Sequence, residues 1–189
     1  MNNYGHFLML DRSPLFPKTL GIYALYGKRV FDIWFSMIGL ILLIPFMGII
    51  SMLIKITSSG PIFFLQERVG QHYKVFNMIK FRSMVPNSSG SLVTVDGDSR
   101  ITPIGKLLRK TKCDELPQLW NVLKGDMSFV GPRPEVSKYV DLFPNDYKDI
   151  LLVRPGITDY ATIEFRNEES VLREYSNVNE AYVAHVYPR

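Results

Sequence analysis

Residues 30–54 read VFDIWFSMIGLILLIPFMGIISMLI, and this apolar stretch decides how the rest of the chain can fold. Lys28 and Arg29 precede it, and Lys55 follows it. A helix needs roughly 20 apolar residues to cross the hydrocarbon core of a bilayer, and this stretch exceeds that length. Most of the chain after it is charged and interrupted by glycine and proline. We therefore predict one membrane helix followed by a small polar domain at the bilayer surface.

Two residues of the stretch bear on whether this helix spans the bilayer or only dips into it. Pro45 has no N–H group, so the carbonyl of Ile41 loses its helical partner and the helix is expected to kink. The carboxylate of Asp32 is costly in lipid unless it stays at the headgroups or pairs with Lys28 or Arg29. Basic residues at both ends leave the direction of insertion undecided. These observations alone favour a single span and a re-entrant helix equally.

Length and composition limit the remaining possibilities. The chain has 189 residues, enough for one globular domain plus a membrane element. Its net charge of +4 suits contact with anionic lipid and phosphate. It has no basic cluster of the kind that nucleic-acid binding requires, so we expect no nucleic-acid partner. The single cysteine, Cys113, excludes an internal disulfide and a cysteine-built metal site. The first residues lack the pattern of a cleavable signal.

Residues 61–82 have the pattern of a β-hairpin, with strands at 61–66 and 75–81 around a turn. The second strand brings Lys80 and Arg82 into the polar domain. In the loop that follows, Asp-Gly-Asp at 96–98 is better explained by turn chemistry than by metal binding.

Two short helices are predicted after this loop. Apolar residues at helical spacing, with a basic opposite face, indicate a helix over 104–112. A second apolar stripe, at 116, 119, 120 and 123, indicates a helix over 114–124. Because Pro117 is tolerated only in a first turn, this helix should begin near Asp114, and Gly125 should end it.

Asp114 and Glu115 would then lie at a helix N-terminus, where free N–H groups and the helix dipole attract anions. Such residues are also ordinary helix caps, so position alone decides little. Arginines that precede and follow this pair, two of them (Arg133 and Arg154) beside prolines, add to the case, since guanidinium groups match phosphate oxygens. These arginines are Arg109, Arg133, Arg154 and Arg166. Together they predict a site for a phosphate-bearing ligand.

The strings from residue 28 to 166 resemble, in order, the bacterial sugar transferases, the small monotopic polyprenyl-phosphate phosphoglycosyl transferases. The matching strings are KRxxD from Lys28, SGPIFFxQERVG from Ser59, KFRSM from Lys80, RIT from Arg100, GKLLR from Gly105, DELPQL from Asp114, NVLKGDMSFVGPRP from Asn121 and RPGIT from Arg154. So many ordered strings make the resemblance specific.

The resemblance implies a fold that is mainly α (α+β) and monotopic. It has a re-entrant helix at 28–58 kinked at Pro45, a short β-hairpin, and short amphipathic helices around the site. Residues 1–27 would form an arm that can lie on the membrane surface. Residues 59–189 would form a cytoplasmic catalytic domain at the inner membrane of a bacterium.

The resemblance also implies an enzyme that moves a sugar-1-phosphate from a UDP-sugar to polyprenyl (undecaprenyl) phosphate and releases UMP. This is the first membrane step of capsule, O-antigen or exopolysaccharide synthesis. Asp114 would be the nucleophile that forms a covalent phospho-sugar intermediate, beside Mg²⁺, and Glu115 would assist. The residues expected to contact phosphate or substrate are Arg109, Arg133, Arg166, Lys80 and Arg82. Downstream glycosyltransferases are expected partners, and a homodimer is left open.

The chain departs from the family pattern at several places. Ile44 stands before Pro45, where a serine is common, and Lys112-Cys113 precedes Asp114 in place of Ser-Leu. Residues 159–162 read DYAT where many members have GWAQ, which bears on the choice of sugar. Many members also continue past the equivalent of Arg189, so a short member and a truncated chain are both open.

Two other functions stay open at this point. A membrane-anchored hydrolase of nucleotide diphospho-sugars would also use an aspartate and Mg²⁺, but would pass the phospho-sugar to water. A non-catalytic membrane partner of glycan enzymes would keep Asp114 and Glu115 as a plain helix cap. The sequence does not name the sugar.

Overall fold

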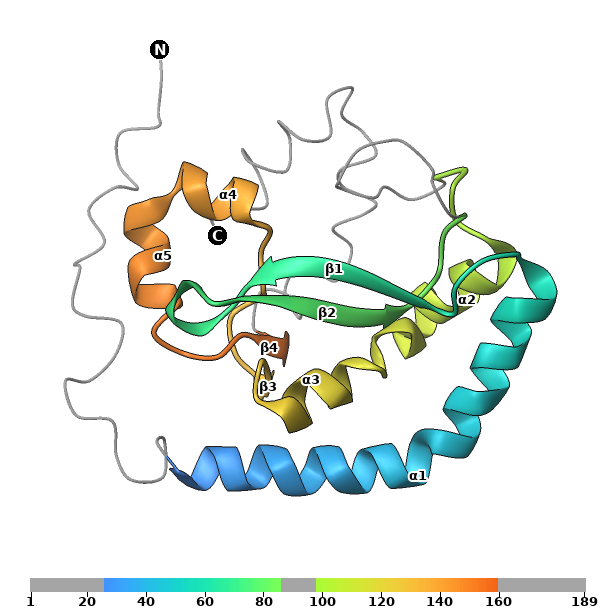
Figure 1. Cartoon of the computed structure of the whole chain (residues 1–189), viewed down its shortest axis with the longest axis horizontal. Coiled ribbons are helices and arrows are strands. Elements are labelled where there is room, and N and C mark those ends of the chain that lie inside the picture. Colours follow the sequence, from blue (N-terminus) through green and yellow to red (C-terminus); the bar gives the residue numbers. More distant parts are fainter. Residues whose placement is uncertain (1–25, 86–97, 160–189) are drawn as a thin grey trace, which may run out of the picture.

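A computed structural model describes residues 26–85 and 98–159 of the chain. In chain order the elements are α1 (Lys28–Thr57), β1 (Phe63–Val69), the 3-10 turn η3 (Gln71–Tyr73), β2 (Val75–Phe81), α2 (Pro103–Thr111), the 3-10 turn η4 (Cys113–Glu115), α3 (Gln118–Lys124), β3 (Ser128–Val130), α4 (Ser137–Leu142), α5 (Pro144–Ile150) and β4 (Gly156–Thr158). In Figure 1 the β1–β2 hairpin crosses the middle of the domain, and α1 runs along two of its sides. The predicted mixture of helices and short strands is confirmed.

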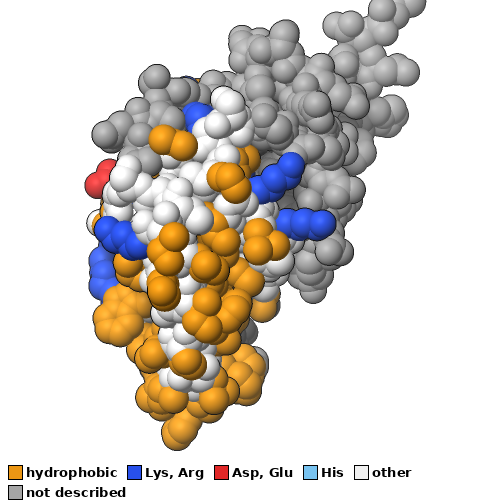
Figure 2. Space-filling model, turned by 90° about the vertical axis from the view of Figure 1, so that its right-hand side faces the viewer, with side chains coloured by type: hydrophobic (Ala, Val, Ile, Leu, Met, Phe, Trp, Pro, Cys, Tyr) orange, Lys and Arg blue, Asp and Glu red, His pale blue; other side chains and the backbone are white. Residues whose placement is uncertain are grey.

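Helix α1 is the long apolar helix expected from the sequence. It is long and apolar enough to cross a membrane, and most of its large side chains are exposed, for example Ile41 at 64% and Leu42 at 70%. Pro45 lies inside it, and the ribbon of α1 changes direction part-way along in Figure 1. Figure 2 shows the side of the molecule that is on the right in Figure 1. Hydrophobic side chains cover its lower part, and Lys and Arg side chains lie higher up. Such a surface suits burial in lipid.

The second half of α1 also packs on the polar domain. Ile50 and Ile54 form a buried cluster with Phe81 of β2 and Leu108 of α2. Burial of such side chains stabilises the contact by about 1.5–3 kcal/mol each. Helix α1 therefore contributes side chains to the core of the polar domain, in addition to its exposed apolar surface.

The hairpin predicted over 61–82 is confirmed. Strands β1 and β2 pair in antiparallel fashion, from Phe63 opposite Phe81 to Val69 opposite Val75. One face of β2 is buried, where Phe76 and Met78 pack against residues of α3 and the segment after it. This packing aligns β2 with α3.

Helix α2 confirms the helix predicted over 104–112. The Thr102 hydroxyl accepts a hydrogen bond from the Gly105 N–H at 3.0 Å, a typical N-cap, and Pro103 occupies the first turn. A Cβ atom on Gly105 would lie 1.9 Å from the carbonyl oxygen of Ser83. Glycine at this position lets α2 approach the backbone that leaves β2.

The prediction of one helix beginning at Asp114 was wrong. Asp114 and Glu115 lie in η4, and α3 begins only at Gln118. Pro117 explains the difference, because it has no N–H to give to the Cys113 carbonyl, which instead accepts from Leu116 three residues on. The predicted end at Gly125 is confirmed, with φ at +101°.

The last described segments were only partly expected. Gly156–Thr158 forms β4, which pairs in parallel with β3, and no strand was predicted at either segment. Helices α4 and α5 bury Val140 and Tyr147 against Val69 at the end of β1. In the loop before α2, Asp98 accepts from the Arg100 N–H at 2.9 Å, which is turn chemistry. Asp96 and Gly97 lie outside the described residues.

Candidate active site

The two adjacent carboxylates of η4 face the end of β2. Lys80 donates a hydrogen bond from its Nζ to Glu115 Oε1 at 2.8 Å. Asp114 is 6% exposed, and its Oδ1 atom has no hydrogen-bond partner within the described part of the chain. Buried carboxylate oxygens without a donor are rare because desolvation is costly. Asp114 therefore presents an oxygen that is kept away from water and is not used by the fold.

The charges around the pair treat the two carboxyl groups differently. Burial raises the pKa of Asp114, and the positive charges of Lys80 and Arg109 only partly offset this. Burial also acts on Glu115, but the charge and hydrogen bond of Lys80 outweigh it and lower the pKa of Glu115. The two groups thus have pKa values moved in opposite directions, a pattern common in catalytic pairs.

The residues present suit one Mg²⁺ ion on Asp114. Mg²⁺ prefers carboxylate oxygens, commonly one or two from the protein, with water and substrate phosphates completing its shell. The unpartnered Oδ1 of Asp114 is such an oxygen. The described residues contain no group of three or more His, Cys, Asp or Glu side chains that could hold a metal ion. Any magnesium here would therefore depend on Asp114 and on the phosphates of a substrate.

The predicted arginines fall in different places. Arg109 on α2 is close enough for its charge to act on Asp114, and the charge of Arg133 acts on Glu115. Arg82 is buried, and its terminal nitrogens donate to the carbonyls of Ser58 and Ser59 at 2.9 and 2.8 Å. A phosphate contact by Arg82 stays a prediction. Arg166 lies outside the described residues.

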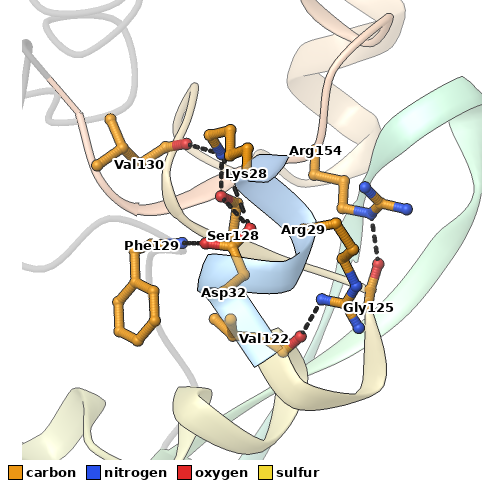
Figure 3. A network of polar contacts seen from close by, with 9 residues as sticks. All are labelled: Lys28, Arg29, Asp32, Val122, Gly125, Ser128, Phe129, Val130 and Arg154. Carbon is orange, nitrogen blue, oxygen red and sulfur yellow. Dashed lines mark hydrogen bonds and ion pairs between the residues drawn. The ribbon is translucent and has the colours of Figure 1, made fainter. Parts of the chain in front are cut away.

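A second polar network lies where α1 begins (Figure 3). Asp32 is 3% exposed and accepts hydrogen bonds from Ser128 Oγ at 2.8 Å and from the Phe129 N–H at 3.2 Å. Lys28 Nζ lies 3.9 Å from Asp32, so the expected pairing of these two residues is confirmed. Sequence reasoning missed Ser128, because nothing local in the sequence links it to Asp32.

The described part of the chain also has a pocket of about 240 Å³ at the turn of the hairpin. Its lining includes Gly70, Lys74, Gly125 and Arg154, but neither Asp114 nor Glu115. Lys80, which contacts Glu115, stands at the other end of β2. The candidate site is therefore defined by the carboxylates and not by this pocket.

Comparison with known proteins identifies the family. The model of the bacterial sugar transferase family matches residues 23–188. The chain belongs to the bacterial sugar transferase family. One relative is an Aeromonas hydrophila UDP-N-acetylgalactosamine-undecaprenyl-phosphate N-acetylgalactosaminephosphotransferase. It is 47% identical to this chain over 147 residues, which cover 75% of this chain and 34% of the relative. The resemblance found in the sequence motifs is confirmed.

Two further relatives are named as an undecaprenyl-phosphate phosphotransferase and as an exopolysaccharide production protein. A Salmonella typhimurium undecaprenyl-phosphate galactose phosphotransferase is 42% identical, over 75% of this chain and 33% of the relative. A Rhizobium leguminosarum exopolysaccharide production protein, PSS, is 44% identical, over 71% of this chain and 72% of the relative. The chain thus spans about a third of the Aeromonas and Salmonella proteins, and most of the Rhizobium one.

Proposed function

We propose that this chain transfers a sugar-1-phosphate from a UDP-sugar to undecaprenyl phosphate and releases UMP. The observation that carries the proposal is the buried Asp114, whose free oxygen lies beside the Lys80–Glu115 pair in a domain built onto an apolar helix. The names of the relatives support the same reaction class. A hydrophobic acceptor lipid explains why the site needs a membrane element at all.

The transfer proceeds in two displacements at one phosphorus atom. An Asp114 carboxylate oxygen attacks the phosphorus that carries the sugar, and the bond from this phosphorus to the bridging oxygen breaks, so UMP leaves with the electron pair. An oxygen of undecaprenyl phosphate then attacks the same phosphorus, and the bond to Asp114 breaks. Glu115, whose lowered pKa keeps it ionised at neutral pH, accepts the proton of the acceptor phosphate.

The cationic residues and a metal ion neutralise the phosphates. When bound, Mg²⁺ would offset the charge of the diphosphate and of the departing UMP. Lys80 holds Glu115 ionised and in place at 2.8 Å. Arg109 and Arg133 bind phosphate oxygens, since their charges already reach Asp114 and Glu115. The predicted contacts of Arg82 and Arg166 with phosphate or substrate stay predictions.

Helix α1 enters and leaves the membrane on the cytoplasmic face, with Pro45 as the cause of its bend. The support comes from its two ends, which bind the same polar domain. Near its start, Arg29 donates to the Val122 carbonyl of α3 at 2.6 Å, while Arg82, directly after β2, donates to the Ser58 carbonyl just after the end of α1. A straight helix of this length would be about 45 Å long, and its ends would lie on opposite sides of a core about 30 Å thick.

The chemical proposal is tested by intact-protein mass. Incubation with the correct UDP-sugar from a panel, without acceptor, should add the mass of one phospho-sugar, and Asp114→Asn should remove the adduct. An adduct that persists in the variant would overturn the assignment of Asp114. Addition of undecaprenyl phosphate should move the phospho-sugar to lipid. Discharge to water alone would favour the hydrolase, and a chain that never forms an adduct nor releases UMP would favour a non-catalytic partner.

Topology is tested by labelling in intact cells. In a Cys113→Ser background, single cysteines at Asn3 and Asn87 should both be shielded from an impermeant thiol reagent. Labelling of the first site alone would show a spanning helix and refute re-entry. The downstream glycosyltransferase partners stay a prediction, and a homodimer stays open.

A further inference from the structure

Glu135 is a buried carboxylate between two arginines, immediately after the Gly131-Pro132-Arg133-Pro134 string. It is 6% exposed, and its backbone carbonyl accepts from the Val69 N–H at 2.8 Å, which ties it to the end of β1. Its Oε2 lies 3.4 Å from Arg68 Nη1, and its Oε1 lies 3.7 Å from Arg133 Nε. Each carboxylate oxygen therefore faces a different guanidinium group.

The two arginines differ in how they are held. The side chain of Arg68 is 15% exposed and is fixed further by the Pro134 carbonyl at 3.1 Å and by Gln66 Oε1 at 2.7 Å. The side chain of Arg133 is 49% exposed, and Glu135 approaches it from the Nε side. Arg68 and Glu135 are thus held within the fold. The side chain of Arg133 contacts Glu135 and extends toward solvent.

The charge of the exposed arginine also reaches the candidate site. The positive charge of Arg133 helps to lower the pKa of Glu115, behind the larger effect of Lys80. A long side chain held at Nε loses less rotational freedom when it binds a phosphate, because part of that freedom is already lost.

We propose that Glu135 is a positioning residue, which holds the Arg133 guanidinium in the orientation that binds a substrate phosphate. The expected effect on catalysis rests on the proposed function. The contact between Glu135 and Arg133 does not depend on it. The competing explanation is that Glu135 only neutralises Arg68 inside the fold. The two explanations differ in what happens to Arg133 when Glu135 loses its charge.

The first test is a double-mutant cycle on sugar-phosphate transfer. Glu135→Gln should lower kcat/KM by about 10- to 50-fold and Arg133→Gln by about 100-fold or more, in the range seen when a charged partner is removed. The double variant should be no worse than Arg133→Gln, because Glu135 acts through Arg133. Glu67→Gln, on exposed surface of β1, is the matched control and should keep wild-type kcat/KM. Losses that multiply in the double variant would overturn the proposal.

The second test needs no activity. The Nε–H resonance of Arg133, identified by its loss in Arg133→Lys, should relax as a rigid group in the wild type and as a mobile one in Glu135→Gln. Glu135→Asp keeps the charge that Arg68 needs but withdraws it by one methylene. It should fold normally yet still free Arg133 and lower kcat/KM about tenfold. A rigid Arg133 in both variants would refute positioning, whereas absence of transfer by the wild type would refute the proposed function alone.

Discussion

Removal of the Asp32 carboxylate should weaken the contact between the start of α1 and β3. Hydrogen exchange at the Phe129 amide should report this change. Asp32 is the acceptor for the Phe129 N–H at 3.2 Å and for Ser128 Oγ at 2.8 Å (Figure 3). A hydrogen bond to a charged group contributes about 1.5–3 kcal/mol. Since about 1.36 kcal/mol is a factor of ten, Asp32→Ala should speed hydrogen exchange at the Phe129 amide by about 10- to 150-fold.

The assay is hydrogen–deuterium exchange followed by NMR on the full chain in detergent or nanodiscs. Asp32→Asn keeps an acceptor oxygen but loses the charge, so it should fall near the lower end of that range. Asp149→Ala, on an exposed position of α5, is the matched control and should leave Phe129 unchanged. An exchange rate in Asp32→Ala within about twofold of the wild type would refute the reasoning, because the side chain would then not hold this amide.

Three further predictions concern the carboxylates and one close packing contact. Lys80→Met should move the acid limb of the pH–activity profile to higher pH, because the positive charge of Lys80 lowers the pKa of both Asp114 and Glu115 and the nucleophile must be ionised. Asp114→Asn should abolish transfer, by about a thousandfold or more, without lowering Tm. Burial raises the pKa of Asp114, so its charge disfavours the folded state above that pKa and the amide removes this penalty at neutral pH. Gly105→Ala should lower Tm by about 5–10 °C in thermal unfolding, since overpacking costs about 1–3 kcal/mol and the new Cβ would lie 1.9 Å from the Ser83 carbonyl oxygen.

Matched controls separate these effects from general disturbance. Lys124→Met removes a cation that is 61% exposed and pairs with Asp126, and it should not move the acid limb. Gly48→Ala adds a methyl group to another helical glycine, one with no atom within 4 Å of the new Cβ, and should leave Tm unchanged. An acid limb that stays in place in Lys80→Met, a fall in Tm in Asp114→Asn, or an unchanged Tm in Gly105→Ala would each contradict its prediction.

Much of the fold follows from short-range patterns in the chain. The length and composition of the apolar stretch at 30–54 are enough to predict a helix that is long and apolar enough to cross a membrane. Two β-prone segments around a turn indicated the hairpin, and the Thr102-Pro103 start of α2 is local capping chemistry. Asp114 and Glu115 stood out because basic and proline-containing motifs accompany them in the sequence, and their catalytic roles stay a prediction.

The error in the start of α3 is local, whereas the omissions came from interactions between residues far apart in the sequence. Pro117 shortened α3 and placed the carboxylates in a 3-10 turn, a choice between two hydrogen-bond patterns that spacing alone did not separate. Glu135 followed a recognised motif, yet its contact with Arg68 became visible only when β1 was placed beside it. Backbone pairing of β3 with β4 likewise joins segments with no shared pattern.

By itself, the sequence determined that this chain has a long apolar helix, a hairpin and an acidic pair beside basic motifs. Those features depend on residues within a few positions of one another, where hydrophobic period and turn chemistry act. Only the tertiary structure decided that Lys80 meets Glu115, that Asp114 is buried with an unused oxygen, and that both ends of α1 bind one domain. Asp32 and Ser128 are 96 positions apart, and only packing of the whole domain brings their side chains within hydrogen-bond distance.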